Sequence, residues 1–459
     1  MSRPLLVLIV CAVSAGAHAQ QGAAQETSTG AQETSTGAQV QETPPGPQDA
    51  SAGEPDTTPK TLQELIATAL RQRANLHARQ ADIEASEEVP SRVGSPPDPT
   101  LMTSASNLRF NDPGLDAAAM SGITVGLTQG IPFPGKLRLR AQAARATTAV
   151  LERVLTSEQA RVALSVERAY WDLWLAQESL TIISETERVL DQLANAVVAR
   201  FSVGEAAQQD ALQVQAAHSS IRSTLIELRQ RLLSAARATE RTVGLDPAGQ
   251  VRSSSEPPLD AVDATALRER LARDNPETRL QRAQVEARRA QLTSAHREQY
   301  PDFMIGAGYR FRREVNGDPT QGADMFSVSL GITLPVFLSR NQAARVRELE
   351  SSVEAAREDL DDTILDVRTA LERALDAIGR VDAQLSLYRG ELLPETDAAL
   401  GASIEDYQFG RVTLNTVLEN WRVDLTTRLE FERLRALRAR QSAILHALLG
   451  ENTSERQGQ

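Results

Sequence analysis

The ten residues MFSVSLGITL at positions 325–334 carry the clearest alternation of side chains in the chain. Apolar side chains occupy every second position and alternate with Ser, Gly and Thr: Phe326, Val328, Leu330 and Ile332. A barrel strand requires this period of two when one face meets lipid and the other a lumen. We therefore expect Leu330 and Ile332 to face outward, and Ser329 and Thr333 to face the lumen. A half-buried sheet in a soluble domain has the same period, so the rest of the chain must decide.

Three further segments are expected to be strands, at about 101–110, 122–131 and 303–312. The second and third repeat the alternation, whereas 101–110 follows it poorly. Four strands are too few to close a membrane barrel, and an open sheet in lipid would leave its edges unpaired. If the strands enter a membrane, several chains must build one barrel together.

The same order of sequence landmarks and predicted elements occurs twice in the chain. Four landmarks recur in one order at offsets of 202 to 206 residues: Ala81–Ala85 with Ala283–Ala287, Pro99–Met102 with Pro301–Met304, Ile131-Pro132 with Leu334-Pro335, and Phe201–Gly204 with Tyr407–Gly410. Each half is predicted to contain a helix, a strand, a loop, a second strand, a proline and a very long helical stretch. The sequence therefore indicates an internal duplication.

The long helical stretches follow from an absence of breakers. No proline occurs between Gly135 and Asp246, and Gly204 is the only glycine between Gly135 and Gly244. Residues 136–203 as one helix would span about 100 Å at 1.5 Å per residue. The second half repeats the pattern up to Leu449, with a break expected at Gly390–Pro394, where a proline marks a joint between two stacked helices. Helices of this length pack side by side into a bundle or tube.

The N-terminus carries a targeting segment. Arg3, the apolar stretch 5–13 and the small-x-small site at 17–19 are typical of a signal peptide. Cys11 leaves a lipoprotein signal open, although it lies inside the apolar stretch. We expect these segments: signal peptide 1–19; disordered tail rich in Pro, Gly, Ser and Thr 20–60; first repeat 61–244, with its hairpin turn near 204; linker 245–260; second repeat 261–450, with its turn near 410; disordered C-terminus 451–459.

Composition and motifs argue against several classes of function. The net charge of −12 gives no surface that would release counterions from nucleic acid. The single cysteine excludes a disulfide framework and a Cys-based zinc site, and the five histidines lack metal-ligand spacing. No phosphate loop or nucleophile elbow is present. We therefore expect no enzyme activity, no catalytic residue, no cofactor and no metal site.

Duplicated halves with paired strands and long helical hairpins, behind a signal peptide, resemble the TolC family of outer-membrane efflux proteins over about 60–450. The segment QGIPFPGK at 129–136 resembles the branch that serves heavy-metal exporters of the cobalt–zinc–cadmium and copper type. The resemblance implies a mainly α fold with a small β part. Three chains with four strands each form a twelve-stranded barrel in outer-membrane lipid, and the helices form a periplasmic tunnel. The implied partners are a periplasmic adaptor and an inner-membrane proton-driven pump.

The resemblance also implies a gate at the periplasmic tip, where the turns at Gly204 and Gly410 lie together. Asp210 falls on an acidic position of the family, Tyr407 on its tyrosine, and Glu419 on one of two acids in the second half.

The chain departs from the family at two places near this gate. Thr416 stands where an acid occurs in the better-known member, and the basic residue, Arg411, directly follows the second glycine. Arg411 or Arg200 is expected to balance the acids. The alternative is that Asp210 and Glu419 are ordinary solvated helix charges.

Other functions stay open at this point. The resemblance implies a passive conduit that exports cargo from the periplasm to the outside. The expected cargo is heavy-metal cations. The alternatives are drug efflux, type I protein secretion, a soluble periplasmic coiled-coil adaptor and an envelope-modifying enzyme. Solubility without detergent would favour the adaptor, and a polar catalytic cluster would favour the enzyme.

Overall fold

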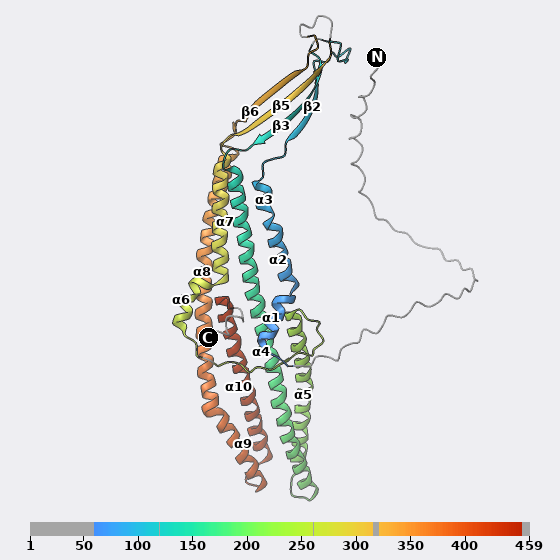
Figure 1. Cartoon of the computed structure of the whole chain (residues 1–459). Helices are drawn as coiled ribbons and strands as arrows, with labels where there is room; N and C mark the ends of the chain where they lie inside the picture. Colours follow the sequence, from blue (N-terminus) through green and yellow to red (C-terminus); the bar gives the residue numbers. More distant parts are fainter. Residues whose placement is uncertain (1–58, 119, 260, 315–320, 452–459) are drawn as a thin grey trace, which may run out of the picture. The chain divides into compact units, whose positions relative to one another are not determined.

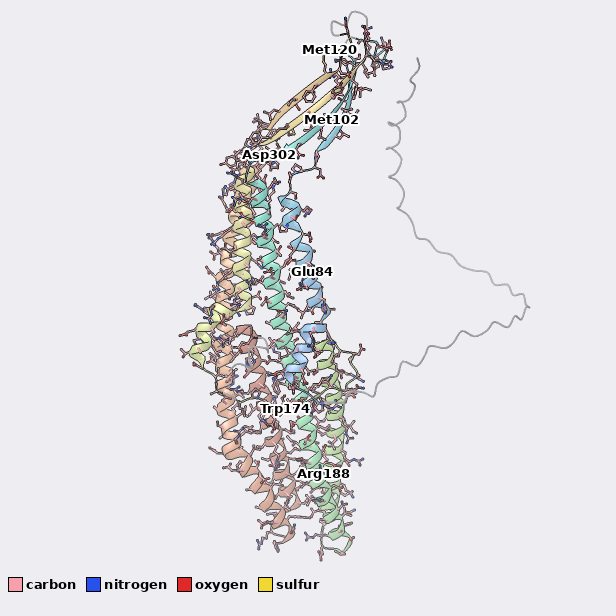
Figure 2. The ribbon with its side chains drawn as sticks, in the orientation of Figure 1. Glu84, Met102, Met120, Trp174, Arg188 and Asp302 are labelled. Atoms are coloured by element: carbon pink, nitrogen blue, oxygen red, sulfur yellow. The ribbon has the colours of Figure 1, made fainter. Side chains whose placement is uncertain are left out.

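The computed structural model describes residues 59–118, 120–259, 261–314 and 321–451. Long helices lie side by side, and four strands lie beyond one end of them (Figure 1). Figure 2 places Asp302 where strands meet helices and Met120 at the far end of the strands. The expected signal peptide with Cys11, most of the expected tail and the last residues of the chain lie outside the described residues.

The four strands form one antiparallel sheet in the order β2-β3-β5-β6. Their bounds are β2 Thr100–Ser106, β3 Gly122–Ile131, β5 Asp302–Arg312 and β6 Met325–Thr333. The β3–β5 pairing joins the two halves of the sequence, with Leu127 opposite Ala307. Among the described residues, β2 and β6 each pair along one side, so the sheet has two free edges.

The sheet has two chemically different faces, because residues opposite each other in antiparallel strands point the same way. One face is apolar and includes Leu101, Val125, Leu127, Phe303, Ile305, Tyr309, Phe326, Val328, Leu330 and Ile332. Leu330 is 73 % exposed in the single chain. The other face consists mainly of Gly, Ser and Thr, including Ser329 and Thr333. The alternation read from the sequence therefore sorts the side chains of this sheet onto separate faces.

The first strand is shorter than expected. It ends at Ser106, four residues before the expected end near 110. Asn107 adopts a positive φ of 59°, and its carbonyl accepts a hydrogen bond from the hydroxyl of Ser121 at 2.7 Å. The chain turns here because the side-chain contact replaces the next step of the ladder.

Three short helices, and not one, precede the first strand: α1 Leu62–Gln72, α2 Ala74–Glu87 and α3 Val89–Gly94. The first begins with a capping box, in which Thr61 and Glu64 each bond the other's backbone N–H. Just before α1, the two-residue strand β1 Pro59–Lys60 pairs in parallel with β4 Arg252–Ser253, which follows the first hairpin. The second half instead has α6 Ala264–Asp274 and α7 Pro276–Glu298 before its first strand.

The long helices form two hairpins. The first consists of α4 Lys136–Ser202 and α5 Gln208–Val243. The second consists of α8 Gln342–Leu387, η1 Tyr388–Leu392, α9 Leu393–Gln408 and α10 Leu414–Leu449. In the described part of the chain, no helix is both long enough and apolar enough to cross a membrane.

The helix break expected at Gly390–Pro394 does not occur in the structure. The backbone stays helical from α8 to α9 through the five-residue π turn η1, and Pro394 lies in the first turn of α9. A π turn widens the helix locally, which accommodates the proline ring and its missing N–H without interrupting the chain of helical residues.

Buried side chains join the two hairpins near their turns. One apolar cluster contains residues from α4, α5, α9 and α10 there: Leu190, Val197, Val214, Ile221, Tyr407, Leu414, Val417 and Trp421. The linker after α5 is tied down by two buried polar side chains. Glu240 accepts three backbone N–H bonds from residues 249–251, and the Tyr170 hydroxyl accepts two from Ser254 and Ser255.

Candidate functional site

Both hairpins end in the same type of glycine turn. Gly204 has φ +82° and Gly410 has φ +69°, a conformation that costs other residues steric strain. In each turn the glycine N–H donates to the carbonyl three residues earlier at 3.0 Å, and the following N–H donates to the carbonyl five residues earlier at 2.9 Å. This pattern satisfies the last carbonyls of a helix. The two turns are therefore equivalent in backbone structure.

Each turn carries one ion pair at the same two positions, with the signs reversed. In the first turn Arg200 Nε lies 3.8 Å from Glu205 Oε2. In the second turn Arg411 Nη1 lies 3.2 Å from Asp406 Oδ1. We call these two ion pairs the turn pairs. Both are partly or largely exposed, so each is a weak contact.

Arg200 also links the two hairpins. Its Cζ lies 5.4 Å from the centre of the Tyr407 ring, and its Nη1 donates to the Tyr407 carbonyl at 3.5 Å. Burial raises the pKa of Tyr407, the charge of Asp210 raises it further, and the charge of Arg200 lowers it. Arg200 of α4 therefore contacts Tyr407 of α9, and Asp210 of α5 lies near enough for its charge to act on this tyrosine.

The remaining predicted gate residues lie elsewhere in the single chain. Arg411 lies over Phe409 at 5.2 Å and belongs to the second turn pair. Glu419 is exposed and approaches Arg422 of its own helix at 3.9 Å. Thr416 lies within hydrogen-bond distance of the Thr413 hydroxyl, at 3.2 Å. One chain thus brings Asp210 and Tyr407 together, with Arg200 as the cation beside them.

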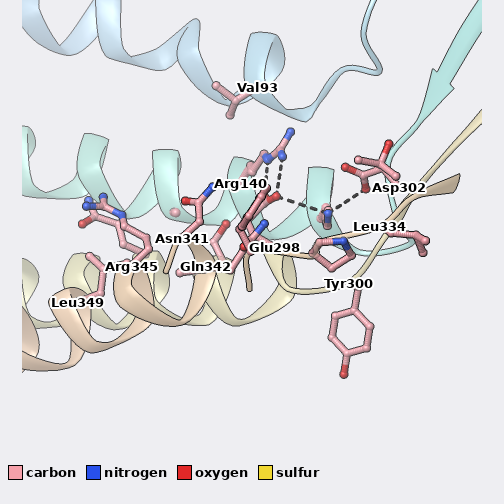
Figure 3. A pocket seen from close by; sticks show the side chains of 18 of the residues that line it. Val93, Arg140, Glu298, Tyr300, Asp302, Leu334, Asn341, Gln342, Arg345 and Leu349 are labelled. Atoms are coloured by element: carbon pink, nitrogen blue, oxygen red, sulfur yellow. Dashed lines mark hydrogen bonds and ion pairs between the residues drawn. The ribbon is translucent and has the colours of Figure 1, made fainter. Parts of the chain in front are cut away.

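A second group of charges lies where the strands meet the helices (Figure 3). Lys136 is 2 % exposed, and its Nζ lies 2.8 Å from Asp302 Oδ1 and 3.6 Å from Glu298 Oε2. Arg140 donates twice to Glu298, at 2.7 and 2.8 Å. We call these four residues the junction cluster. They line a cavity of about 700 Å³ between α4, α7 and the beginning of α8.

An aromatic stack closes the same junction. Phe133 stacks on Tyr300 at 4.7 Å and on Phe303 at 6.4 Å. Arg297 lies 4.8 Å over both Phe133 and Tyr300 and donates to the Pro134 carbonyl at 2.9 and 3.1 Å. The segment 129–136, which carries the family resemblance, is therefore fixed to the end of α7 and the start of β5.

Sequence analysis missed the junction cluster. One signal was available, because Lys136 is one of only two lysines among the 49 basic residues of the chain. Its acidic partners lie more than 160 residues away, however, and nothing in the sequence pairs them. In the described residues, no group of three or more His, Cys, Asp or Glu side chains is placed to hold a metal ion.

A two-faced sheet with free edges, joined to long helical hairpins that end in paired glycine turns, defines an outer-membrane channel protein. The family model described as "Outer membrane efflux protein" matches residues 65–245 and 267–451. The chain belongs to this family, which confirms the resemblance found in the sequence.

Individual relatives agree with this assignment. The chain is 22 % identical over 377 residues to the cobalt-zinc-cadmium resistance protein CzcC of Cupriavidus metallidurans, covering 81 % of this chain and 86 % of that protein. It is 20 % identical over 364 residues to the outer membrane efflux protein BepC of Brucella suis, covering 78 % of each. The solved outer membrane protein VceC of Vibrio cholerae shares the fold, with a TM-score of 0.71, 18 % identity, and coverage of 85 % of this chain and 96 % of that one.

The family defines the general function. The protein is the outer-membrane channel component of a tripartite efflux system, with its strands in the outer membrane and its helical tunnel in the periplasm. The soluble adaptor considered from the sequence is thereby excluded.

Proposed function

We propose that three copies of this chain share one barrel and form a passive conduit for heavy-metal cations. The observation that carries the proposal is the sheet with one apolar face, one Gly/Ser/Thr face and two free edges. An apolar outer surface and a small, polar inner surface suit a barrel wall in lipid. Free edges need partners there, and four strands from each of three chains would supply a twelve-stranded closed wall.

Strand length supports the membrane placement. The longest strand, β5, has 11 residues. At about 3.4 Å per residue it spans about 37 Å, and a tilt of about 45° reduces its height to about 26 Å, close to the apolar band of outer-membrane barrels.

We also propose that the chain is an internal duplication, with repeats at 61–244 and 261–450 around a linker at 245–260. The family match in two segments supports this, as do the two glycine turns with identical hydrogen-bond patterns.

The tip is proposed to be the gate. Arg200 contacts Tyr407 between the two hairpins of one chain near their turns, and the charge of Asp210 acts on the same tyrosine. Threefold symmetry would bring three copies each of Asp210 and Glu419 to one constriction. A ring of carboxylates focuses negative potential and favours cations. Counter-charges from Arg200 and Arg411 would keep the ring closed until a partner displaces them.

The proposed partners follow from the class of system. An adaptor would dock on the turns, where Val203 and Phe409 each precede a turn glycine and are 71 % and 73 % exposed. A proton-driven pump in the inner membrane would supply the energy, since we propose no catalytic residue and no bound cofactor in this chain. The similarity to a cobalt-zinc-cadmium resistance protein supports metal cations as cargo.

Cargo is tested in cells that carry or lack the gene. Deletion should lower the tolerated concentrations of cobalt, zinc and cadmium severalfold and leave tolerance of organic toxins unchanged. Loss of tolerance only towards organic toxins would instead indicate drug efflux, and loss of an exported protein would indicate type I secretion.

The gate is tested by single-channel recording in planar bilayers. Asp210→Ala/Glu419→Ala should reduce cation preference and weaken block by multivalent cations added from the periplasmic side. The control Glu227→Ala/Glu350→Ala removes two exposed acids away from the tip and should retain both properties. Retention of both properties in the first variant would return Asp210 and Glu419 to the status of ordinary solvated charges.

A further inference from the structure

The two turns that lead from strand to long helix differ sharply in their surroundings. The first, 132–135, is covered within the chain by Tyr300 and Phe303, and Lys136 is buried beside Asp302. The second, 334–341, presents an apolar surface: Leu334 is 68 %, Val336 76 % and Phe337 70 % exposed.

A residue correspondence relates the two turns. Gln342 begins α8 as Lys136 begins α4, and the offset of 206 is the one that separates Gly204 from Gly410. On the opposing segment, the offset of 202 that relates Pro99 to Pro301 makes Thr100 the counterpart of Asp302 and Leu101 the counterpart of Phe303. The buried Lys136–Asp302 pair of the first half therefore has the neutral counterparts Gln342 and Thr100.

These counterparts do not meet within one chain. Thr100 begins the free edge strand β2, whereas Gln342 follows the opposite edge strand β6. The Oε1 atom of Gln342 is buried and has no hydrogen-bond partner among the described residues. A buried acceptor without a donor is costly. Gln342 lines the cavity beside Lys136, and its amide would have to turn outward to accept a bond from a neighbouring copy. Leu101 is 69 % exposed on the other edge.

We infer that Thr100 of a neighbouring copy donates a hydrogen bond to Gln342, in the place where Asp302 meets Lys136 within the chain, and that Leu101 of that copy covers the apolar turn 334–337. The inference rests on the proposed three-chain barrel and identifies a contact between neighbouring chains below the membrane. The strand register agrees with it. Ile131 lies opposite Phe303 in the β3–β5 pair. Offsets of 203 from Ile131 to Leu334 and of 202 from Leu101 to Phe303 place Leu334 opposite Leu101 and Leu330 opposite Ala105 of the neighbour.

The change from charged to neutral partners has a physical reason. Lys136 and Asp302 meet as soon as one chain folds, so a buried charge is never left alone. Gln342 and Thr100 meet only after two chains associate. A buried lysine waiting for its partner would be penalised far more than an amide, so a neutral pair suits the contact between chains. Arg340 and Asp98, both exposed in the single chain, add opposite charges to the two surfaces.

Cross-linking in the assembled full-length protein tests the inference. In a Cys11→Ala background, Thr100→Cys/Gln342→Cys treated with a short bifunctional thiol reagent should give a ladder of two and three linked chains on a denaturing gel. The matched control Lys136→Cys/Asp302→Cys occupies the equivalent positions within one chain, and its product should run as a single chain.

A third variant separates this inference from the proposed barrel. Leu330→Cys/Ala105→Cys reports whether β6 of one chain pairs with β2 of another. Cross-linking there without cross-linking at Thr100 and Gln342 would overturn the inference and leave the barrel intact. Failure at both sites, in protein that extracts as single chains, would overturn the barrel as well.

A charge exchange provides evidence that does not depend on cysteine chemistry. Gln342→Lys should lower the yield of assembled channel severalfold, because the lysine would face a neutral hydroxyl. Adding Thr100→Asp should restore the yield by recreating the Lys136–Asp302 arrangement between chains. An equal yield for Gln342→Lys and the unmodified chain would contradict the inference.

Discussion

The junction below the strands and the tips of the hairpins both hold the two halves of the chain together, but by different means. At the junction, Lys136 is almost completely buried between two carboxylates beside an aromatic stack. At the tips, the turn pairs are partly or largely exposed, and Arg200 reaches Tyr407 at the limit of hydrogen-bond distance. Buried paired charges are costly to disrupt, whereas exposed pairs contribute little. The difference indicates a fixed junction and a tip that can move.

The largest effect is expected at the junction. Asp302→Ala leaves Lys136 buried with only the more distant Glu298, and should lower the free energy of unfolding by about 3–5 kcal/mol. Denaturant titration in detergent, followed by circular dichroism, measures the loss. The matched change at the tip, Asp406→Ala, should cost far less, and an equal loss at both sites would remove the contrast between the two regions.

The next effect is expected above the junction, on the two faces of the sheet. Leu330→Arg should cost about 2–4 kcal/mol if the residue lies near the middle of the bilayer, and Arg at the neighbouring Ser329 should be tolerated. Folding titrations into lipid vesicles measure both variants. Equal tolerance would mean that the alternation reports a contact other than lipid.

The sequence predicted the strands and hairpins well, and the contacts between them poorly. Alternation placed β3 at 122–131, because side-chain period is a local property of a strand. Glycine placed the turns, because positive φ is also a local requirement. The Arg200–Tyr407 contact joins residues 207 positions apart, and no local pattern selects that arginine over Arg411. The π turn at 388–392 was missed since proline alone does not distinguish a break from a widened helix.

A smaller effect is expected from the turn glycines. Gly410→Ala forces alanine into a left-handed conformation and should cost about 1–2 kcal/mol. Gly401→Ala lies inside α9 with nothing within 4 Å of the added methyl group, and should stabilise the chain by about 0.5–1 kcal/mol. Thermal unfolding of the two variants should therefore shift in opposite directions. Shifts of the same sign would show that the tip does not depend on this turn geometry.

The smallest change in stability should produce a visible change in function. Arg200→Ala removes the cation over the buried Tyr407 together with the partly exposed first turn pair, contacts that should contribute about 1 kcal/mol or less. Because the same contacts hold α4 against α9, the variant should show a larger open fraction in planar-bilayer recordings. Arg411→Ala removes only the second turn pair and is the control. Unchanged gating in Arg200→Ala would assign closure to other residues.

All of these expectations depend on a sheet that one chain cannot close. Native mass spectrometry of the detergent-extracted protein measures the number of chains in the particle without any substitution. The free edges of β2 and β6 predict one species with the mass of three chains, which separates into single chains only on denaturation. A stable, lipid-inserted single chain would contradict the shared barrel.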